Sequence, residues 1–296
     1  MPENKREDLL KGIIDIHIHT APDVRPRRLS DLELAAEARR VGARAIVIKS
    51  HVVPTMDRAW IAQQATPGIQ VFGGITLNPQ IGGLNLAAVE SAVKMGAKFV
   101  WLPTAWSAND RRRAGHNDGV ETVVDGKVVP ALVSILKLIA EHNLVLGTGH
   151  LSPAESLVVV AEARKQGVQK IVVNHPEWTS VDMSIAQQRE LAAFGVYFER
   201  CYARSVGGKY ETNFRRNLEA MEAIGFQSTI VATDGGQVEN PLWSEALAEY
   251  IGFLLQAGVP QSAVDLMTKE NPAKLLDLPE CQQKHGEERV IEWAKR

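Results

Sequence analysis

The stretch Ile13-Ile14-Asp15-Ile16-His17-Ile18-His19, near the start of the chain, is rich in isoleucine and ends in His-Ile-His. Its β-branched residues favour a strand. Side chains two residues apart on a strand point to the same face, so His17 and His19 present neighbouring imidazoles at its C-terminal end. Two neutral imidazoles held in this way are natural ligands for a divalent transition metal such as zinc. A half-buried strand with one polar face would give the same pattern, so the rest of the chain has to decide between the two interpretations.

Length and composition indicate an ordinary globular protein. The 296 residues suffice for one large domain or two small ones, and the formal net charge of −2 argues against a general binder of nucleic acid or of membrane surfaces. No apolar run approaches the roughly 20 residues that span a bilayer, and the N-terminus lacks the apolar centre of a signal peptide. Cys201 and Cys281 are far apart and give no disulfide framework, which fits a reducing compartment. We therefore expect a cytoplasmic protein.

Strand-like and helical segments alternate along the chain. Eight segments read as strands, at residues 13–19, 44–51, 70–77, 98–102, 144–150, 170–175, 196–200 and 228–234. Helical segments separate them, and this alternation predicts an α/β fold, the (β/α)8 or TIM barrel, whose typical length is roughly 250 residues. An open doubly wound sheet is the alternative, but no Gly-rich phosphate loop follows any strand. Since no Ser-, Gly- or Pro-rich linker divides the chain, we expect residues 1–296 to form a single domain with its barrel core at about 13–276.

One segment interrupts this regular pattern. Residues 103–130, after the fourth strand, contain a run of three arginines and a hairpin over 121–129 that turns at Asp125-Gly126. This segment is predicted to be an insertion on the loop after strand four.

Residues able to bind metal recur where the predicted strands end. In a (β/α)8 barrel these C-terminal ends meet at one mouth, where the chemistry takes place. Besides His17 and His19, the strand ends carry Lys49, His51, His150, His175 and Asp234. A scatter of eight histidines would rarely give this distribution, so the sequence predicts a metal site at the mouth.

This set of residues resembles the metal-site pattern of the amidohydrolase superfamily. That pattern has His-x-His on strand one, single histidines on strands five and six, and an aspartate ending strand eight. The segment Thr268-Lys-Glu-Asn-Pro-Ala-Lys-Leu-Leu276 is also similar to a helix near the C-terminus of many members. The resemblance implies a metal-dependent hydrolase of the TIM-barrel type that pairs with itself as a homo-oligomer. It also implies a divalent metal, zinc first and manganese or iron as alternatives, in one or two ions. The implied ligands are His17, His19, His150, His175 and Asp234, although His150 and His175 could instead hold the attacking water.

Two departures from the family pattern matter. The fourth strand ends in Phe99-Val-Trp-Leu-Pro-Thr104 and offers neither the lysine nor the glutamate that bridges two metals in many members, so one metal is the simpler expectation. Lys49 lies outside the common pattern and follows an apolar run, which should lower the pKa of its ammonium group. Lys49 could act on a substrate carbonyl, carry a carboxylate that bridges metals, or form an internal ion pair with Asp234 or Glu199.

The expected reaction is hydrolysis of a C–N bond in an amide, lactam or cyclic imide, or of a related ester, in a small and anionic substrate. Asp234 would act as general base and then acid, while His175 or Lys49 would stabilise the oxyanion. Metal-dependent phosphoester hydrolysis, decarboxylation or deamination, and a catalytically silent binding barrel remain alternatives. Arginines on the mouth loops could bind the anion, and tryptophans could form apolar walls or serve packing alone. The predicted substrate-binding residues are Arg25, His51, Arg111, His116 and Trp178, with Arg27, Arg28, Arg112, Arg113, Trp101 and Trp106 on the same strands or loops.

Overall fold

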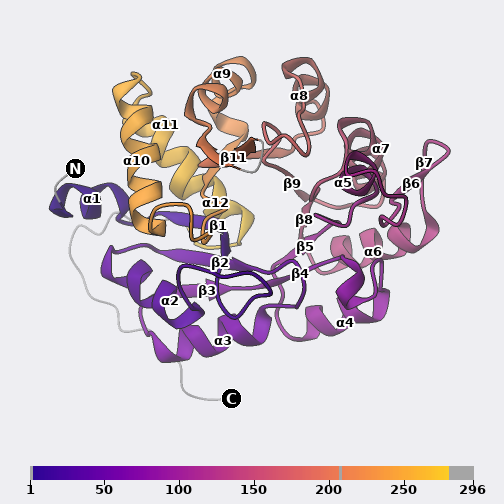
Figure 1. Cartoon of the computed structure of the whole chain (residues 1–296), viewed down its shortest axis with the longest axis horizontal. Coiled ribbons are helices and arrows are strands. Elements are labelled where there is room, and N and C mark those ends of the chain that lie inside the picture. The colour runs from indigo at the N-terminus through magenta and orange to yellow at the C-terminus, as the bar shows by residue number, and fades with distance from the viewer. Residues whose placement is uncertain (1–2, 207–208, 280–296) are drawn as a thin grey trace.

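Parallel strands lie at the centre of the molecule with helices around them (Figure 1). The structure is a computed structural model, and it describes residues 3–206 and 209–279. Eight strand positions follow one another: β1 (Ile14–His19), β2 (Ala45–Lys49), β3 (Gln70–Phe72) with β4 (Gly74–Thr76), β5 (Phe99–Trp101), β8 (Val145–Gly147), β9 (Lys170–Asn174), β10 (Tyr197–Cys201) and β13 (Thr229–Ala232). The predicted (β/α)8 fold is confirmed.

The strands form two sheets, in the orders β1-β2-β3 and β4-β5-β8-β9-β10-β13. The third barrel strand is divided at Gly73, where an added Cβ would lie 2.4 Å from the carbonyl oxygen of Thr55. This close approach requires glycine. On the two sides of Gly73, β3 pairs with β2 and β4 pairs with β5. Between β13 and β1 the ring is completed by a parallel bridge of Ile18 with Gly235, in which His19 N donates to Gly235 O at 2.9 Å.

A buried carboxylate supplements this short backbone pairing between the first and last strands. Asp15, which is completely buried, accepts hydrogen bonds from Thr233 Oγ1 at 2.6 Å and from Trp243 Nε1 at 2.9 Å. Burial raises the pKa of Asp15 to about 6. Side chains therefore join β1, β13 and the helix that follows β13.

The outer helices pack apolar faces onto the strands, and serine side chains cap two of them. Ser30 and Ser152 each cap a helix through a capping box with a glutamate three residues later. The helices that follow the barrel strands are α2 (Asp31–Arg40), α3 (Met56–Ala65), α4 (Leu86–Lys94), α6 (Pro130–Glu141), α7 (Pro153–Lys165), α8 (Ile185–Ala192), α9 (Phe214–Ile224) and α10 (Trp243–Gln256). Shorter turns are η1 (Pro79–Ile81) and η2 (Phe226–Ser228), and the C-terminal series is α11 (Gln261–Asp265), η3 (Leu266–Glu270) and α12 (Asn271–Leu275).

Three elements lie outside the regular pattern of strand and helix. The insertion after β5 contains α5 (Ala108–Arg113) and the predicted hairpin, β6 (Val123–Val124) with β7 (Lys127–Val128). A second hairpin, β11 (Ala203–Val206) with β12 (Lys209–Thr212), was not predicted, because residues 203–212 lack a clear apolar alternation. The short N-terminal helix α1 (Glu3–Leu10) was also not predicted, since only its last two residues are apolar.

Within residues 3–206 and 209–279, no helix is both long enough and apolar enough to cross a membrane. Cys201 is buried, and Cys281 lies outside the described residues.

Candidate metal centre

Three side chains from the two ends of the chain meet at the mouth of the barrel. His17 and His19 come from β1, and Asp234 follows β13 in the left-handed backbone conformation, at φ 48°. Asp234 Oδ1 lies 3.0 Å from His17 Nε2 and 3.1 Å from His19 Nε2, and the two nitrogens are 3.3 Å apart. All three side chains are buried.

These separations fit a shared divalent cation. Zinc binds histidine nitrogen and carboxylate oxygen at about 2.0–2.2 Å, so neighbouring ligand atoms in a zinc site lie roughly 3.0–3.5 Å apart. His17 Nδ1 faces the carboxylate of Glu199 at 3.1 Å, which leaves Nε2 of the neutral ring with a lone pair directed at the other two atoms. Three electron-rich atoms so close together need a cation or a proton between them, and the donor set suits a metal.

The electrostatics of the site also favour positive charge at this point. Burial lowers the pKa of His17, but the carboxylates of Asp234 and Glu199 outweigh it and raise that pKa to about 9. Burial lowers the pKa of His19 to about 3, so this ring is neutral and available as a ligand. Burial would raise the pKa of Asp234, but the neighbouring His17 and His19 outweigh burial and hold that pKa well below its usual range.

Glu199 orients the His17 ring through Nδ1, the nitrogen that faces away from the centre. The Glu199 carboxylate lies on β10, is completely buried, and accepts a hydrogen bond from Asn174 Nδ2 at 2.6 Å. Metal-binding histidines commonly donate their second ring N–H to a carboxylate, which fixes the tautomer and the direction of the ligand nitrogen. Glu199 and Asn174 therefore hold Nε2 of His17 toward the centre.

His175 is buried beside the centre, and neither of its ring nitrogens has a hydrogen-bond partner in the described part of the chain. Its ring centroid lies 5.8 Å from that of His17, and its backbone adopts φ 26° at the end of β9. Burial lowers the pKa of His175 well below the usual value. A neutral buried imidazole without a partner has donor capacity for a ligand at the mouth.

Lys49 approaches the centre from β2. Its Nζ lies 3.0 Å from His17 Nε2 and 5.4 Å from the ring centroid of Trp101. Burial lowers the pKa of Lys49, as expected from the apolar run before it. The ammonium group is thus next to the proposed ligands, but in the part of the chain that the structure describes it makes no ion pair with Asp234 or Glu199 within 4.0 Å.

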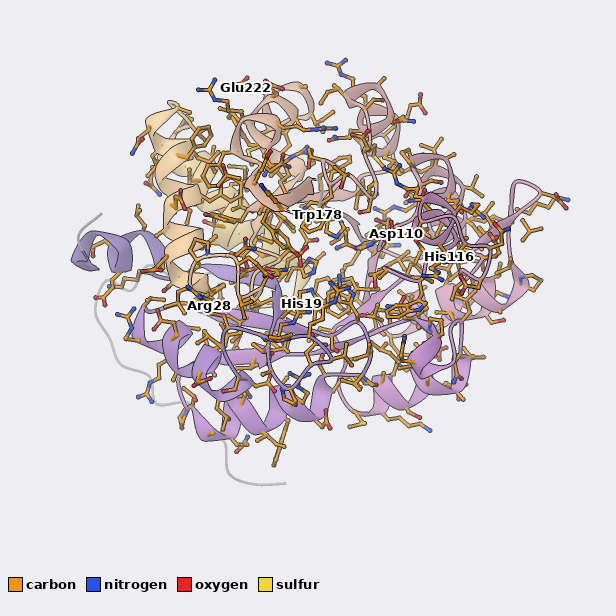
Figure 2. The ribbon with its side chains drawn as sticks, viewed as in Figure 1. His19, Arg28, Asp110, His116, Trp178 and Glu222 are labelled. Atoms are coloured by element: carbon orange, nitrogen blue, oxygen red, sulfur yellow. The ribbon has the colours of Figure 1, made fainter. Side chains whose placement is uncertain are left out.

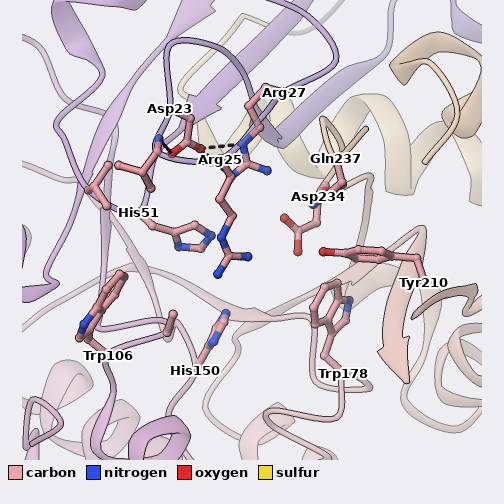
Figure 3. A pocket seen from close by; sticks show the side chains of 13 residues that line it. Asp23, Arg25, Arg27, His51, Trp106, His150, Trp178, Tyr210, Asp234 and Gln237 are labelled. Atoms are coloured by element: carbon pink, nitrogen blue, oxygen red, sulfur yellow. Dashed lines mark hydrogen bonds and ion pairs between the residues drawn. The ribbon is translucent and has the colours of Figure 1, made fainter. Parts of the chain in front are cut away.

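His150 pairs with a carboxylate of the insertion through one of its ring nitrogens. Its Nδ1 lies 2.6 Å from Asp110 Oδ2, a carboxylate of the insertion helix α5. The cluster of His17, His19 and Asp234 does not include His150. His150 instead lines the pocket above the centre, with its ring directed into it (Figure 3).

The pocket is a cavity of about 100 Å³ with the Asp234 carboxylate at one side. Figure 3 shows the guanidinium of Arg25 in the middle of the pocket and the hydroxyl of Tyr210 pointing toward Asp234. The lining residues come mainly from the loops after the strands: Asp23, Val24, Arg25, Arg27, His51, Val52, Ala105, Trp106, His150, Trp178, Tyr210, Asp234 and Gln237. Gln237 Nε2 donates to the backbone oxygen of Asp234 at 2.7 Å and supports its unusual backbone.

Some predicted binding residues do not reach this pocket. Arg111 donates to Asp118 at 2.6 Å, so its charge is already paired within the insertion, and His116 is exposed on the same segment (Figure 2). Trp101 is completely buried in the barrel core, where it stacks on Phe99. Among the predicted binding residues, the structure therefore brings Arg25, His51 and Trp178 to the pocket, but not Arg111 or His116.

One pocket residue and the carboxylate that pairs with His150 were not predicted. Tyr210 lies on the unpredicted β11–β12 hairpin, although the Gly207-Gly208 pair between two short runs with β-branched or aromatic residues is a hairpin pattern. Asp110 lies in the insertion, and no sequence pattern links it to His150, 40 residues later.

The sequence of residues 12–199 matches the model of a family of unknown function, DUF6282. The chain belongs to the DUF6282 family. No curated protein matches it. Among solved structures, this DUF6282 protein is similar to an amidohydrolase from Pseudomonas aeruginosa, with a TM-score of 0.62 and 14% identity over 92% of this chain and 97% of the other.

Two further solved structures show the same likeness. A putative 2-pyrone-4,6-dicarboxylic acid hydrolase from Pseudomonas putida gives a TM-score of 0.59 at 15% identity, covering 90% of this chain and 97% of that one. An amidohydrolase from Burkholderia multivorans with bound zinc gives 0.55 at 14% identity, covering 90% and 99%. The expected resemblance to amidohydrolases is thus confirmed for the fold.

Proposed function

We propose that this DUF6282 protein is a metal-dependent hydrolase of a small, anionic substrate, cleaving the C–N bond of an amide, lactam or cyclic imide, or the C–O bond of a related ester or lactone. The observation that carries the proposal is the convergence of His17 Nε2, His19 Nε2 and Asp234 Oδ1 within 3.3 Å of one another. One solved structure with this fold contains zinc, and zinc is the metal that we propose. Another is described as a hydrolase of a pyrone dicarboxylic acid, which supports the anionic substrate and the ester alternative.

The bound metal would supply a water of lowered pKa and polarise the scissile carbonyl. Asp234 faces both imidazoles with Oδ1. Among the described residues its Oδ2 has no hydrogen bond, so Oδ2 can accept a proton from the attacking water. Glu199 keeps His17 in the tautomer that points Nε2 at the centre. His175 and Lys49, both buried beside His17, would donate hydrogen bonds to the oxyanion.

We further propose that His150 is a proton carrier rather than a metal ligand. The Asp110 carboxylate holds Nδ1, so Nε2 faces the pocket and can deliver a proton to the leaving group. His51, fixed through Nδ1 by Thr104 Oγ1 at 2.8 Å, lines the same wall and contacts substrate.

The decisive test combines metal analysis with a substrate screen. The purified protein should contain about one equivalent of a divalent metal and hydrolyse at least one member of a panel of amides, lactams, cyclic imides and lactones. Asp234→Asn should keep the far-UV circular dichroism and abolish turnover. A metal-free protein that takes up no added zinc, manganese or iron, or an Asp234→Asn variant with full activity, would refute the proposal.

The phosphoesterase alternative loses its main support, because the arginines of the insertion are paired with neighbouring groups. Arg111 pairs with Asp118, and Arg112 pairs with Glu121 and Glu155, both at 2.8 Å. Aryl phosphates in the same screen provide its test.

A further inference from the structure

The pocket contains an arginine whose charge has no partner among the residues that the structure describes. Arg25 makes no hydrogen bond or ion pair within residues 3–206 and 209–279, although its guanidinium lies in the pocket (Figure 3). The other arginines of the mouth loops are engaged by groups of the protein: Arg27 by Asp23, Arg28 by the Val238 carbonyl, Arg111 by Asp118, Arg112 by Glu121 and Glu155, and Arg113 by the Thr179 carbonyl. Arg25 is therefore the arginine available to a ligand.

The loop that carries Arg25 is fixed on both sides of it. Arg27 donates to Asp23 through Nε and Nη2, both at 2.6 Å, and these two side chains are only 4% and 2% exposed. Arg28 N donates to Gly236 O at 3.0 Å, which attaches the loop to the segment carrying Asp234. This buried ion pair closes the loop around residue 25 and fixes its backbone. The Arg25 side chain is exposed to solvent, and its guanidinium extends from this loop into the pocket (Figure 3).

Aromatic side chains flank the guanidinium. Trp106 and Trp178 line opposite sides of the pocket, and Tyr210 lies beside Trp178, with the two ring centroids 6.1 Å apart (Figure 3). The cavity of about 100 Å³ has room for a small ring. Flat walls favour a planar ligand that can stack on them.

We propose that Arg25 binds the carboxylate of a small planar ring and so defines the substrate class of this site, an inference that rests on the proposed hydrolase function. The planar fork of a guanidinium matches a carboxylate through two parallel hydrogen bonds. A single unpaired arginine balances one negative charge, which fits a monocarboxylate better than a phosphate dianion. With its carboxylate on Arg25, the ring of the ligand lies between the tryptophans and its reacting group faces Asp234.

Binding of model ligands tests this substrate class. Isothermal titration calorimetry with benzoate, benzamide, cyclohexanecarboxylate and phenyl phosphate compares charge, shape and anion type. Benzoate should bind at least tenfold more tightly than benzamide and more tightly than the other two. Arg25→Gln should weaken benzoate binding at least tenfold and leave benzamide unchanged. Arg28→Gln is the matched control, because Arg28 lies on the same loop, is exposed, and donates to a backbone carbonyl at 3.3 Å.

Each contrary outcome overturns a stated part of the inference. Equal benzoate affinity in the wild type and Arg25→Gln, or no benzoate binding at all, removes Arg25 as the anion site. Tighter binding of phenyl phosphate would rule out the carboxylate as the preferred anion. Equal binding of cyclohexanecarboxylate and benzoate would rule out a preference for planar rings.

Titrations repeated after removal of metal with a chelator separate this inference from the proposed function. Benzoate that binds the chelated protein through Arg25 does so without contacting a metal. Failure of the proposed function would appear as no metal uptake and no turnover, with Arg25-dependent binding intact. Failure of the substrate class would appear as normal metal uptake and turnover without dependence of benzoate binding on Arg25.

Discussion

The imidazole of His17 has a different partner on each of its nitrogens. Nδ1 faces Glu199, and Nε2 faces the other two donors of the candidate centre. The residues that act through His17 can therefore be separated experimentally from those that would touch the metal itself.

Glu199→Gln should lower zinc affinity by about 10–100-fold, the usual effect of removing a carboxylate that orients a metal-binding histidine. The amide of glutamine would direct a second donor at Asn174 Nδ2, so the ring of His17 would lose its fixed direction. Competition with a chromophoric chelator measures the affinity. Glu222→Gln, on the exposed side of α9 (Figure 2), is the control and should have no effect. Unchanged affinity in Glu199→Gln would mean that Glu199 has no orienting role.

His150→Gln should reduce turnover by about 100-fold or more while the protein keeps its metal, because His150 lies outside the cluster of His17, His19 and Asp234 that would hold the ion. Asp110→Asn should reproduce part of this loss, since Nδ1 would no longer be held. The measurements are kcat and metal content of the same preparations, with Asp118→Asn, an exposed carboxylate nearby, as control. Loss of metal in His150→Gln would identify His150 as a ligand instead.

At the scale of elements, the loop after β13 depends on a close approach to β1. At Gly236, with φ 110°, an added Cβ would lie 1.8 Å from the carbonyl oxygen of His19. No neighbouring side chain can yield to relieve this contact, because the clashing atom belongs to the backbone that carries a proposed ligand.

Gly236→Ala should therefore lower the free energy of unfolding by about 2–3 kcal/mol or more, and should weaken metal binding as well. Gly126→Ala, in the β6–β7 turn, is the matched control: its φ is 70°, but nothing lies within 4 Å of the added Cβ. Urea denaturation of both variants gives the difference. Equal destabilisation of the two variants would show that backbone strain alone, and not the contact with His19, determines the loss.

The helices and strands also show how much of the fold and of the candidate site the sequence could predict. The strand ending in His17 and His19, the alternation of strands with helical segments, and the aspartate ending the last strand were enough to predict the barrel and the meeting of these three residues. Periodicity cannot predict contacts made by irregular segments. For that reason the partner of His150, the approach of Tyr210 and the internal pairing of Arg111 emerge only from the three-dimensional arrangement.

At the scale of the whole molecule, metal binding should be visible in stability. A cation that binds the folded chain at a concentration about 100 times its Kd stabilises it by about 2.7 kcal/mol, which should raise Tm by about 5 °C. Thermal unfolding after chelation, and again after added zinc, measures this shift. Asp234→Asn should abolish the response to zinc, whereas Asp118→Asn should retain it. A wild-type Tm that is indifferent to zinc would contradict the candidate centre.

The short pairing between β1 and β13 has one more consequence. The proposed ligands come from residues 17 and 19 on one side of this junction and from residue 234 on the other. An ion bound there would connect the two ends of the barrel at a junction where the described backbone pairs through the bridge of Ile18 with Gly235. Chemistry and closure of the ring would then depend on the same ion.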